Sequence, residues 1–329
     1  MDFSKLIQAG AVALAVAGCA SLETPKYPTQ PVRFVIPYPV GNSADVVSRI
    51  VIDKLAPAWD QPVAIENRAG PTTIPGTESV ARAAGDGHTL LAHSVSFAVD
   101  ASLFSGLPYD PARDFVPVAG FARQPFALVV APGLGVKSVA DLVARAKATK
   151  LKFGSLGPTT QIYFVGEQFR RKAGVEATHV AFKSLVEANA AVARGEVDFW
   201  FPPVAGAVGG VRDGKLVALA VTAAARSASL PNVPTLAEAG MPGQESAAWF
   251  GLWAPAATPR GIVRRIAADV QTALQSADVR EKLARLGAEP MNLSGDDFGH
   301  FVAAEIDAAR ALTRQLGIAP QAYKPPPPK

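Results

Sequence analysis

The chain has 329 residues, enough for two domains of ordinary size, and 49% of its residues are hydrophobic while only 18% are charged. This balance excludes an intrinsically disordered chain and predicts a folded protein with a substantial core. The formal net charge is +4, and the basic residues are spread along the chain without a stripe of interleaved aromatic residues, which argues against a nucleic-acid-binding protein.

The N-terminal segment predicts export. A single lysine near the start is followed by an apolar run at 6–18, which is too short to span a bilayer and fits the hydrophobic region of a secretory leader. The run ends in "VAGCA" at 16–20, which resembles the lipidation motif of bacterial lipoproteins, with Cys19 as the residue to be lipidated. The alternative is an ordinary signal peptide with an incidental cysteine. In both cases residues 1–27 form a leader and tether, and we expect a periplasmic protein.

Apolar runs that predict β-strands alternate with helical patterns along the rest of the chain. The strand runs lie at 32–36, 88–93, 126–131, 152–155, 179–182, 197–201, 216–222 and 247–254. The first helical pattern begins at Asp45, which we expect to cap its helix, and others lie at 138–148, 184–196, 258–275, 277–287 and 294–317. This alternation predicts an α/β fold in which largely parallel sheets are flanked by helices.

Two segments rich in Gly and Pro, at 122–135 and 222–243, predict where the chain passes between two lobes. Two crossings imply an inserted domain with a cleft between the lobes. The first lobe is expected to contain residues 28–124 plus 226–320, and the second residues 125–225. Residues 321–329, with the sequence "KPPPPK" at their end, are expected to form a Pro-rich tail.

The chain lacks the residue patterns that common classes of enzyme need. Its four histidines, His88, His93, His179 and His300, have no partner at metal-ligand spacing. We expect them to be structural, with His93 the best candidate for a site because it stands at a strand end. No nucleophile elbow, dinucleotide fingerprint or phosphate-binding loop follows a strand. The sequence therefore predicts a protein that is not an enzyme and uses no metal or cofactor.

Loops of small polar residues follow several predicted strands and indicate a binding site. They lie at 39–45, 68–77, 93–96, 154–161 and 181–184. Such loops line ligand crevices in open α/β sheets, and the first and fourth lead directly into helices. A helix N-terminus presents N–H groups and a positive partial charge that bind anions. Each loop alone could be only a helix cap or a turn, but five in one chain favour a site.

Long phrases, in order along the chain, resemble one family of binding proteins. They include "YPTQPVRFVIPYPVGNSADVVSRIV", "LPYDPARDFVPVA", "LPNVPTLAEAGMPG" and "WFGLWAPAATPRGIV". They resemble the extracytoplasmic solute-binding proteins of tripartite tricarboxylate transporters, the Bug family, over about residues 28 to 320. The resemblance implies a two-lobed periplasmic-binding-protein fold of the type II kind, monomeric, which closes on an organic anion and docks on membrane subunits of the transporter.

The resemblance also implies which residues grip the ligand. The first strand–helix loop and the Gly/Ser-rich loop of the second lobe would pinch a carboxylate, mainly through backbone N–H groups. Other residues would line the two lobes or stand near the hinge. The implied set is Tyr38, Val40, Gly41, Asn42, Ser43, Pro71, Thr72, His93, Ser94, Ser96, Phe97, Ser155, Gly157, Thr159, Thr160, Tyr163, Phe182, Lys183, Phe201 and Trp249.

Departures from the family pattern suggest the character of the ligand. The first loop carries Val40 and Asn42 where the family usually reads P-P-G-G-S. Tyr163 replaces a usual His, and Pro202 stands where an Asp is common, so a ligand ammonium group would lack a buried partner. The bulky apolar residues expected to contact the ligand body are Val40, Phe97, Ile162, Tyr163 and Phe201. The sequence therefore predicts an organic carboxylate with an apolar or aromatic part rather than citrate or an amino acid.

These inferences lead to one predicted function and two alternatives. The protein is expected to bind a small organic carboxylate by lobe closure and deliver it to a membrane transporter of the tripartite tricarboxylate type. One alternative is a sensor that presents its closed form to a membrane signalling kinase. The other is an α/β hydrolase, which the lack of a nucleophile, His and acid set disfavours.

Overall fold

Strand β1 (Val32–Ile36) shows why the first sheet is covered on both faces. Phe34 and Ile36 pack into one apolar cluster and Val35 into another on the opposite face, because successive side chains alternate along a strand. All three side chains are fully buried. A strand that is buried on both faces requires helices on both sides of its sheet.

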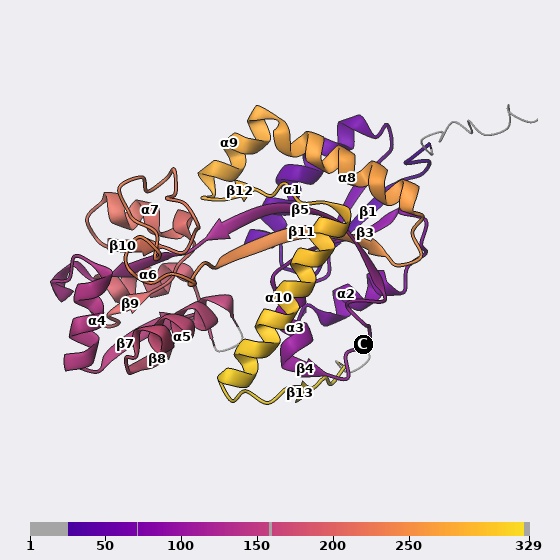
Figure 1. Ribbon diagram of the computed structural model, residues 1–329. Helices are drawn as coiled ribbons and strands as arrows, with labels where there is room; N and C mark the ends of the chain where they lie inside the picture. Colours follow the sequence, from indigo (N-terminus) through magenta and orange to yellow (C-terminus); the bar gives the residue numbers. More distant parts are fainter. Residues whose placement is uncertain (1–25, 71, 158–159, 326–329) are drawn as a thin grey trace, which may run out of the picture.

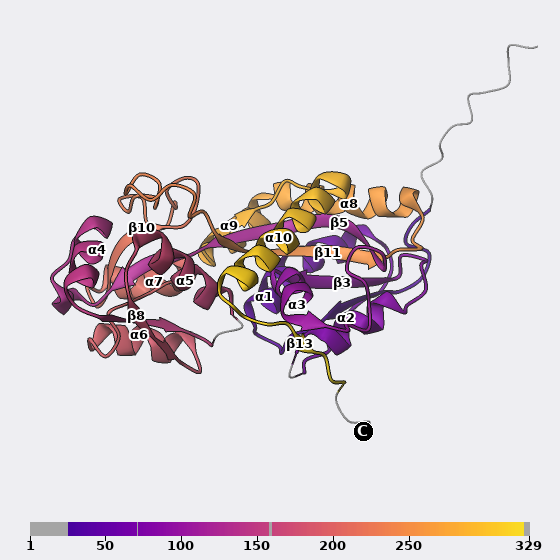
Figure 2. The same ribbon diagram turned by 60° about the horizontal axis from the view of Figure 1, so that its bottom comes forward.

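The computed structural model describes residues 26–70, 72–157 and 160–325 and has two lobes side by side (Figure 1, Figure 2). The six-stranded sheet of the first lobe has the order β12 (Glu289–Pro290), β5 (Phe115–Pro125), β11 (Ala247–Pro255), β3 (Thr89–Ser94), β1 and β2 (Val63–Asn67). The five-stranded sheet of the second lobe has the order β10 (Val217–Val221), β6 (Ala127–Val130), β9 (Phe199–Trp200), β7 (Leu151–Ser155) and β8 (Ala177–Ala181).

Helices cover both faces of the first sheet and surround the second. The helices on the Phe34 face are α1 (Ser43–Leu55), α8 (Arg260–Gln275) and α9 (Ala277–Arg285), and those on the Val35 face are α2 (Ile74–Ala81), α3 (Ser96–Leu103) and α10 (Gly295–Gln315). The second lobe has α4 (Val139–Ala148), α5 (Gln161–Ala173), α6 (Leu185–Ala193) and α7 (Val204–Arg212) (Figure 1). Short 3-10 helices lie at Ala56–Ala58 and Pro132–Leu134.

Each sheet is mixed, with parallel strands on one side and antiparallel strands on the other. β1 pairs in parallel with β2 and β3, and β7 pairs in parallel with β8 and β9. β5 and β11 are antiparallel, as are β6 and β10. The two-lobed α/β architecture is the predicted one. The sheets contain fewer parallel pairs than predicted, because β5, β6, β10 and β11, near the hinge, pair antiparallel with their neighbours.

Strands β5 and β11 join the lobes. They pair along the whole length of β11, from its end in the first lobe to Ala247. Just beyond, Ser246 N–H donates to Thr222 O at 3.0 Å, and Phe126 N–H donates to Thr222 Oγ1 at 2.9 Å. The connection between the lobes is therefore a hydrogen-bonded pair of strands, closed at the second lobe by Thr222.

The segment 226–246 lies with the second lobe. Leu230, Leu236 and Met241 are buried in the core of that lobe, and Leu236 N–H donates to Val221 O at 2.9 Å. We predicted this segment for the first lobe. The predicted boundary at residue 225 is wrong, because apolar side chains between the glycines and prolines complete the second core.

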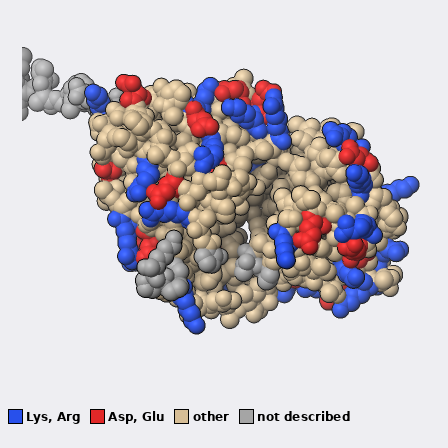
Figure 3. All heavy atoms as spheres, turned by 180° about the vertical axis from the view of Figure 1, so that it is seen from behind, with Lys and Arg blue, Asp and Glu red and all other residues tan. Residues whose placement is uncertain are grey.

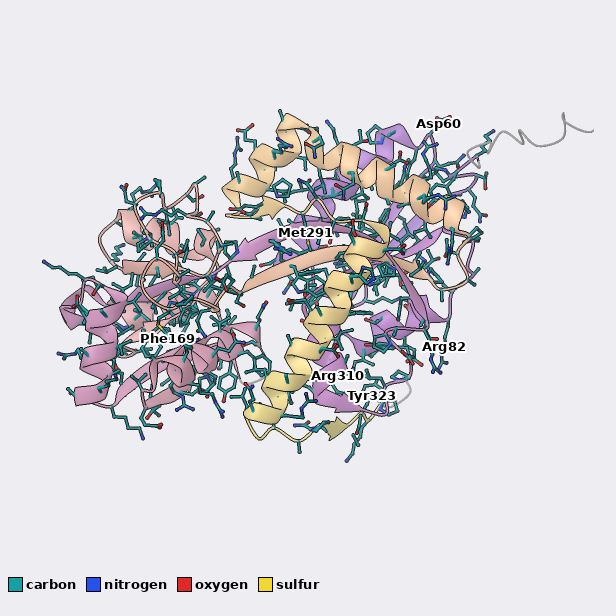
Figure 4. All side chains as sticks on the ribbon, viewed as in Figure 1. Asp60, Arg82, Phe169, Met291, Arg310 and Tyr323 are labelled. Carbon is teal, nitrogen blue, oxygen red and sulfur yellow. The ribbon has the colours of Figure 1, made fainter. Side chains whose placement is uncertain are left out.

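Some strands lie outside the predicted elements. β5 contains Pro117, Gly120 and Pro125, residues that count against a strand in a sequence pattern. β13 (Gln321–Ala322) pairs with β4 (Phe104–Ser105), and the next residue, Tyr323, donates its N–H to Ser105 O at 2.9 Å (Figure 4). The first residues of the predicted tail therefore belong to the first lobe. Strand β2 was also missed.

No helix within residues 26–70, 72–157 and 160–325 combines the length and the apolar character needed to cross a bilayer. Cys19 and most of the predicted leader and tether lie outside the described residues.

Replacing Leu236 with Ala tests whether its segment completes the second core. Leu236 is 2% exposed, so the substitution should lower the free energy of unfolding by about 2–4 kcal/mol. Asn232→Ala, at an exposed position in the same segment, should change it by less than about 0.5 kcal/mol. Urea unfolding followed by circular dichroism measures both, and equal midpoints for the two variants would contradict this placement.

Candidate functional site

The cleft lies where parallel strands of both lobes end beside the hinge. After β3, Val95 N–H donates to Trp249 O at 2.9 Å. After β7, Gln161 Nε2 donates to Ala247 O at 2.9 Å. Both acceptors lie close together on β11, so the starts of α3 and α5 approach each other from opposite lobes. Figure 3 shows the surface hollowed between the two lobes.

The first-lobe loop is fixed by the start of α1. Asn42 is the N-cap, and its Oδ1 accepts the N–H of Ala44 at 2.9 Å. Asp45 is buried in the first turn, and its Oδ2 accepts the N–H of Gly41 at 2.8 Å. We predicted Asp45 as the cap. The structure assigns that position to Asn42, and Asp45 reaches back toward the loop as in a capping box.

Asp45 also ties the loop to the end of β2. Its Oδ1 accepts hydrogen bonds from Arg49 Nε and Asn67 Nδ2, each at 2.8 Å, and Asn67 Nδ2 also donates to Tyr38 O at 3.0 Å. Burial alone would raise the pKa of Asp45, but the hydrogen bonds it accepts, above all from Asn67, outweigh burial and hold the pKa below its usual value. The carboxylate therefore stays ionised at neutral pH and holds the loop from behind.

Tyr38 connects the same loop to the end of β3. Its Oη lies 2.6 Å from Ser94 Oγ and 3.1 Å from His93 Nδ1. His93 Nδ1 also lies 2.8 Å from Ser94 N and 3.0 Å from Ser94 O. Burial lowers the pKa of His93 to about 3 and raises that of Tyr38. Both side chains are therefore neutral and act as supports of the loop.

Ser155 and Thr160 shape the second-lobe loop. Ser155 Oγ accepts the N–H of Gly157 at 2.9 Å and lies 2.7 Å from His179 Nε2. Thr160 is the N-cap of α5, where its Oγ1 donates to Gly157 O at 2.7 Å and accepts the N–H of Tyr163. Because Ser155 is fully buried, its hydroxyl positions Gly157 instead of reaching a ligand.

Gly41 and Gly157 occupy corresponding places in the two loops. Their φ angles are +82° and +120°, in a region that residues with a side chain rarely adopt. A Cβ added to either residue would meet no atom of the described residues within 4 Å, so among these residues both backbones have open space beside them. Each glycine is close to the N-terminus of a long helix, where N–H groups favour an anion. The pair of loops can approach a carboxylate with backbone alone.

An apolar contact joins the lobes beside these loops. Val99 and Leu103 of α3 cluster with Phe164 of α5, and both Tyr163 and Leu312 of α10 pack against them. Tyr163 was predicted to contact the ligand body. Its half-buried ring packs against the contact between the lobes, and its contact with a ligand stays a prediction.

The structure brings one part of the predicted set together. The predicted residues that form or directly support the two loops are Tyr38, Val40, Gly41, Asn42, Ser43, His93, Ser94, Ser96, Ser155, Gly157 and Thr160. Phe182 and Lys183 follow β8, and Phe182 N–H donates to Ser155 O at 2.9 Å. Pro71 and Thr159 lie outside the described residues.

Three apolar residues do not line the cleft as predicted. Phe97 is fully buried and stacks on Trp253 at a centroid distance of 4.8 Å. Phe201 is fully buried against Phe169 of α5 at 5.5 Å, and Ile162 packs into the second core. The prediction that these side chains contact a ligand is wrong for this structure, because each belongs to the core that supports its lobe.

Trp249 is buried on β11 at the hinge, and Thr72 borders a different part of the first lobe. Trp249 Nε1 donates to Glu305 Oε2 of α10 at 2.7 Å. The indole borders a hinge-side cavity of about 530 Å³, whose wall also includes Arg123 and Phe164. No described residue of 38–43, 155–157 or Thr160 lines this cavity. Thr72 borders a separate pocket beside Tyr323.

Sequence reasoning missed several supporting side chains. Asn67 ends strand β2, which was not predicted, so the sequence offered no reason to place Asn67 at the carboxyl edge of the sheet. Gln161 lay inside a predicted loop, but its contact with Ala247 depends on the other lobe. His179 was expected to be structural, and only the pairing of β8 with β7 brings it to Ser155. In the described part of the chain, no group of three or more His, Cys, Asp or Glu could hold a metal ion.

Comparison with known proteins decides the family. The family model described as "Tripartite tricarboxylate transporter family receptor" (TctC) matches residues 47–318. The chain belongs to this family. Protein BugT of Bordetella pertussis is 32% identical over 322 residues, which cover 96% of this chain and 99% of BugT. The predicted family is confirmed, and the receptor is a periplasmic solute-binding protein rather than an enzyme.

Solved structures confirm the fold of this receptor. Rpa4515 of R. palustris, solved with adipate, has a TM-score of 0.76 and 33% identity over 89% of this chain and 99% of its own. MatC from Rhodopseudomonas palustris, solved with bound malate, has a TM-score of 0.71 and 31% identity over 87% of this chain and 99% of its own. The predicted two-lobed binding-protein fold is therefore correct.

Asp100 of α3 anchors a further first-lobe segment of the receptor. Thr73 Oγ1, just before α2, donates a hydrogen bond to Asp100 Oδ2. Asp100 is buried and has no salt-bridge partner among the described residues. Burial raises the pKa of Asp100 to about 6, against a lowering by the Thr73 hydrogen bond. Its ionised form therefore destabilises the fold at neutral pH.

Replacing Asp100 with Asn should stabilise the receptor at pH 7.5 by up to about 3 kcal/mol, because two pKa units correspond to roughly that free energy. A raised carboxyl pKa costs stability above the folded-state value and none below the unfolded-state value. The gain should therefore shrink as pH falls from about 6 toward 3.8. Urea unfolding at pH 7.5 and pH 4 measures this. A pH-independent difference would contradict the assigned role.

Proposed function

We propose that this receptor closes its lobes around a carboxylate group of a small organic acid and presents the closed form to the membrane subunits of a tripartite tricarboxylate-type transporter. The observation that carries this proposal is the matched pair of loops at Gly41 and Gly157. Each has a left-handed glycine, open space beside it and a helix N-terminus next to it. In this proposal the two loops, one from each lobe, meet the ligand in the cleft between the lobes.

The electrostatics of the loops favour an anion without a buried cation. The Arg49 guanidinium, on the helix that follows the first loop, is paired with Asp45 at 2.8 Å, so it is neutralised. Attraction then comes from the positive ends of α1 and α5 and from backbone N–H groups. Such a site can accept carboxylates of different shape, because the backbone binds the common group and the rest of the cleft selects the ligand.

The two structural relatives bind dicarboxylates of different length, adipate in one and malate in the other, as their descriptions state. Both are similar to this receptor over nearly all of its described residues. They support an organic acid as the ligand class here. They do not favour an aromatic body.

We propose that the apolar part of the ligand packs on Val40. Of the five apolar residues expected to contact it, Val40 alone is a large exposed side chain, with 73% of its surface accessible. It stands on the first-lobe loop next to Gly41. Covering it on closure would stabilise the complex through burial of apolar surface.

The leader supports a proposal on delivery. An apolar run followed by "VAGCA" suits export, and lipidation of Cys19 would hold the receptor, as a monomer, near its membrane partners. Intact-mass measurement of the protein purified from membranes decides between a lipidated Cys19 and simple cleavage. No feature of the described residues favours the signalling-kinase alternative.

The ligand class is tested by thermal shift with adipate, malate and adipamide. Both acids should raise the melting temperature at millimolar concentration, while the neutral diamide should not, because the helix N-termini favour negative charge. Val40→Ser should reduce the shift with adipate more than that with malate. Equal stabilisation by adipamide would contradict carboxylate recognition, and an unchanged adipate shift in Val40→Ser would contradict the apolar contact.

Gly157→Val should weaken carboxylate binding by at least about tenfold. The valine side chain would occupy the space beside the loop, and its backbone would be strained at a φ of +120°. Gly174→Val is the matched control. Gly174 also has a positive φ, +63°, and open space beside it, but it caps the C-terminal end of α5, far from the loop at its N-terminus. Both should destabilise the fold by about 1–3 kcal/mol. Isothermal titration with adipate at a temperature where both are folded compares them. Equal affinities would contradict the proposed loop.

A further inference from the structure

His179 lies behind the second-lobe loop, where the family-based prediction gave it no role. It belongs to β8, opposite Phe153 of β7 in a parallel pair. Its Nε2 lies 2.7 Å from Ser155 Oγ, and Ser155 is fully buried. The His179 side chain is half-buried, between the buried Ser155 hydroxyl and the surface of the lobe.

The hydrogen bonds form a continuous chain from His179 to the start of α5. Gly157 N–H donates to Ser155 Oγ at 2.9 Å. Gly157 O accepts hydrogen bonds from Thr160 N–H at 3.1 Å and from Thr160 Oγ1 at 2.7 Å. A serine hydroxyl has one hydrogen to donate. With the ring proton of His179 on Nδ1, the short contact to Nε2 takes that hydrogen while the oxygen accepts from Gly157. With the proton on Nε2, Nε2–H donates to Ser155 Oγ and the hydroxyl hydrogen turns to Gly157 O at 3.3 Å. The orientation of the hydroxyl is thereby fixed.

Aromatic rings hold the imidazole in place. The ring centroid of His179 lies 5.1 Å from that of Phe153 and 4.8 Å from that of Tyr163. Gly157 itself has open space beside it and no side chain to restrict it. Its position is therefore determined by its hydrogen bonds, and the first of these depends on the hydroxyl that His179 orients.

We propose that His179 is a positioning residue of the receptor, whose Nε2 fixes the Ser155 hydroxyl and through it the Gly157 backbone that meets the ligand carboxylate. This inference rests on the proposed function of the second-lobe loop. His179 does not touch the ligand. Its effect on affinity comes from keeping Gly157 preorganised, which reduces the ordering that binding would otherwise require.

Charged groups around His179 set how it responds to pH. From α5 it faces Tyr163 and Glu167, and the Glu167 carboxylate is bound by Arg170 at 2.8 Å and lies 4.0 Å from Arg171. Burial lowers the pKa of His179 below its usual value, while Glu167 acts in the opposite direction. Below that pKa, Nε2–H donates to Ser155 Oγ, whose hydrogen then turns toward Gly157 O at 3.3 Å. The loop bond to Gly157 N–H is kept, and a positive charge is added behind an anion site.

The test compares His179→Leu with His179→Gln. Leu keeps an apolar side chain against Phe153 and Tyr163 but cannot accept a hydrogen bond, whereas the Gln amide can reach the place of Nε2. At pH 7.5, isothermal titration with adipate should show roughly five- to tenfold weaker binding for His179→Leu, the usual effect of one lost hydrogen bond. His179→Gln should stay within about twofold of the wild type. His300→Leu, at an exposed position of α10, is the control and should bind as the wild type does.

The pH profile separates positioning through the hydrogen bond from packing. As pH falls through the pKa of His179, which burial holds below its usual value, adipate affinity should rise more in the wild type than in His179→Gln, because the imidazolium attracts the anion and the glutamine cannot titrate. Comparison of the two proteins removes the titration of adipate itself. Affinities of His179→Gln as weak as those of His179→Leu, wild-type affinity in His179→Leu, or identical pH profiles would each overturn the inference.

A ligand-free readout keeps this inference separate from the proposed function. Amide hydrogen exchange at Gly157, followed by NMR in the absence of ligand, should be faster in His179→Leu than in the wild type and restored in His179→Gln. Failure of adipate and malate to bind the wild type would count against the proposed ligand class alone. Unchanged Gly157 exchange in His179→Leu would overturn the role of His179 whatever the ligand is.

Discussion

Strands β5 and β11 pair antiparallel along the full length of β11 and carry the chain from one lobe to the other. The same strand offers Ala247 O to Gln161 of the second lobe and Trp249 O to Val95 of the first, both at 2.9 Å. The residues at the starts of α3 and α5 are therefore both hydrogen-bonded to the same strand, β11. The second loop leads into α5, and Tyr38 ties the first loop to Ser94, just before α3. Both loops are therefore connected to β11, directly or through one further hydrogen bond.

The side chains around the cleft act mainly behind the loops. Asp45 fixes Gly41, Tyr38 bridges to Ser94, and Ser155 fixes Gly157. Several polar side chains that were predicted to contact the ligand are used in this way, which in the proposed site leaves backbone N–H groups for the ligand. Buried polar groups need hydrogen-bond partners, and the partners of Asp45, Tyr38 and Ser155 include backbone and side-chain groups of the loops or of the strand ends beside them.

The lobes also touch away from the loops. Val99 and Leu103 of α3 meet Phe164 of α5, and the hinge-side cavity of about 530 Å³ lies next to this contact, with Trp249 and Glu305 in its wall. A rotation of the lobes about β5 and β11 changes the cleft, the contact and the cavity together, since all three are bounded by the same elements. In the proposed lobe closure, a change in this apolar contact would therefore accompany capture of the ligand.

The sequence by itself determined the alternation of strands and helices, the two-lobed class and the two loops at Gly41 and Gly157. Strand periodicity, helix starts and glycine-bearing turns are local properties, so they can be recognised without the tertiary structure. The resemblance to a family indicated that the two loops act together. Only the tertiary structure decided that Phe97 and Phe201 belong to the cores, that 226–246 completes the second lobe, and that Asp45, Asn67 and His179 support the loops. An apolar residue near a strand end has the same sequence signal whether it faces a core or a cleft. A hydrogen bond such as that between Ser155 and His179 joins residues 24 apart and exists only once β7 and β8 have paired.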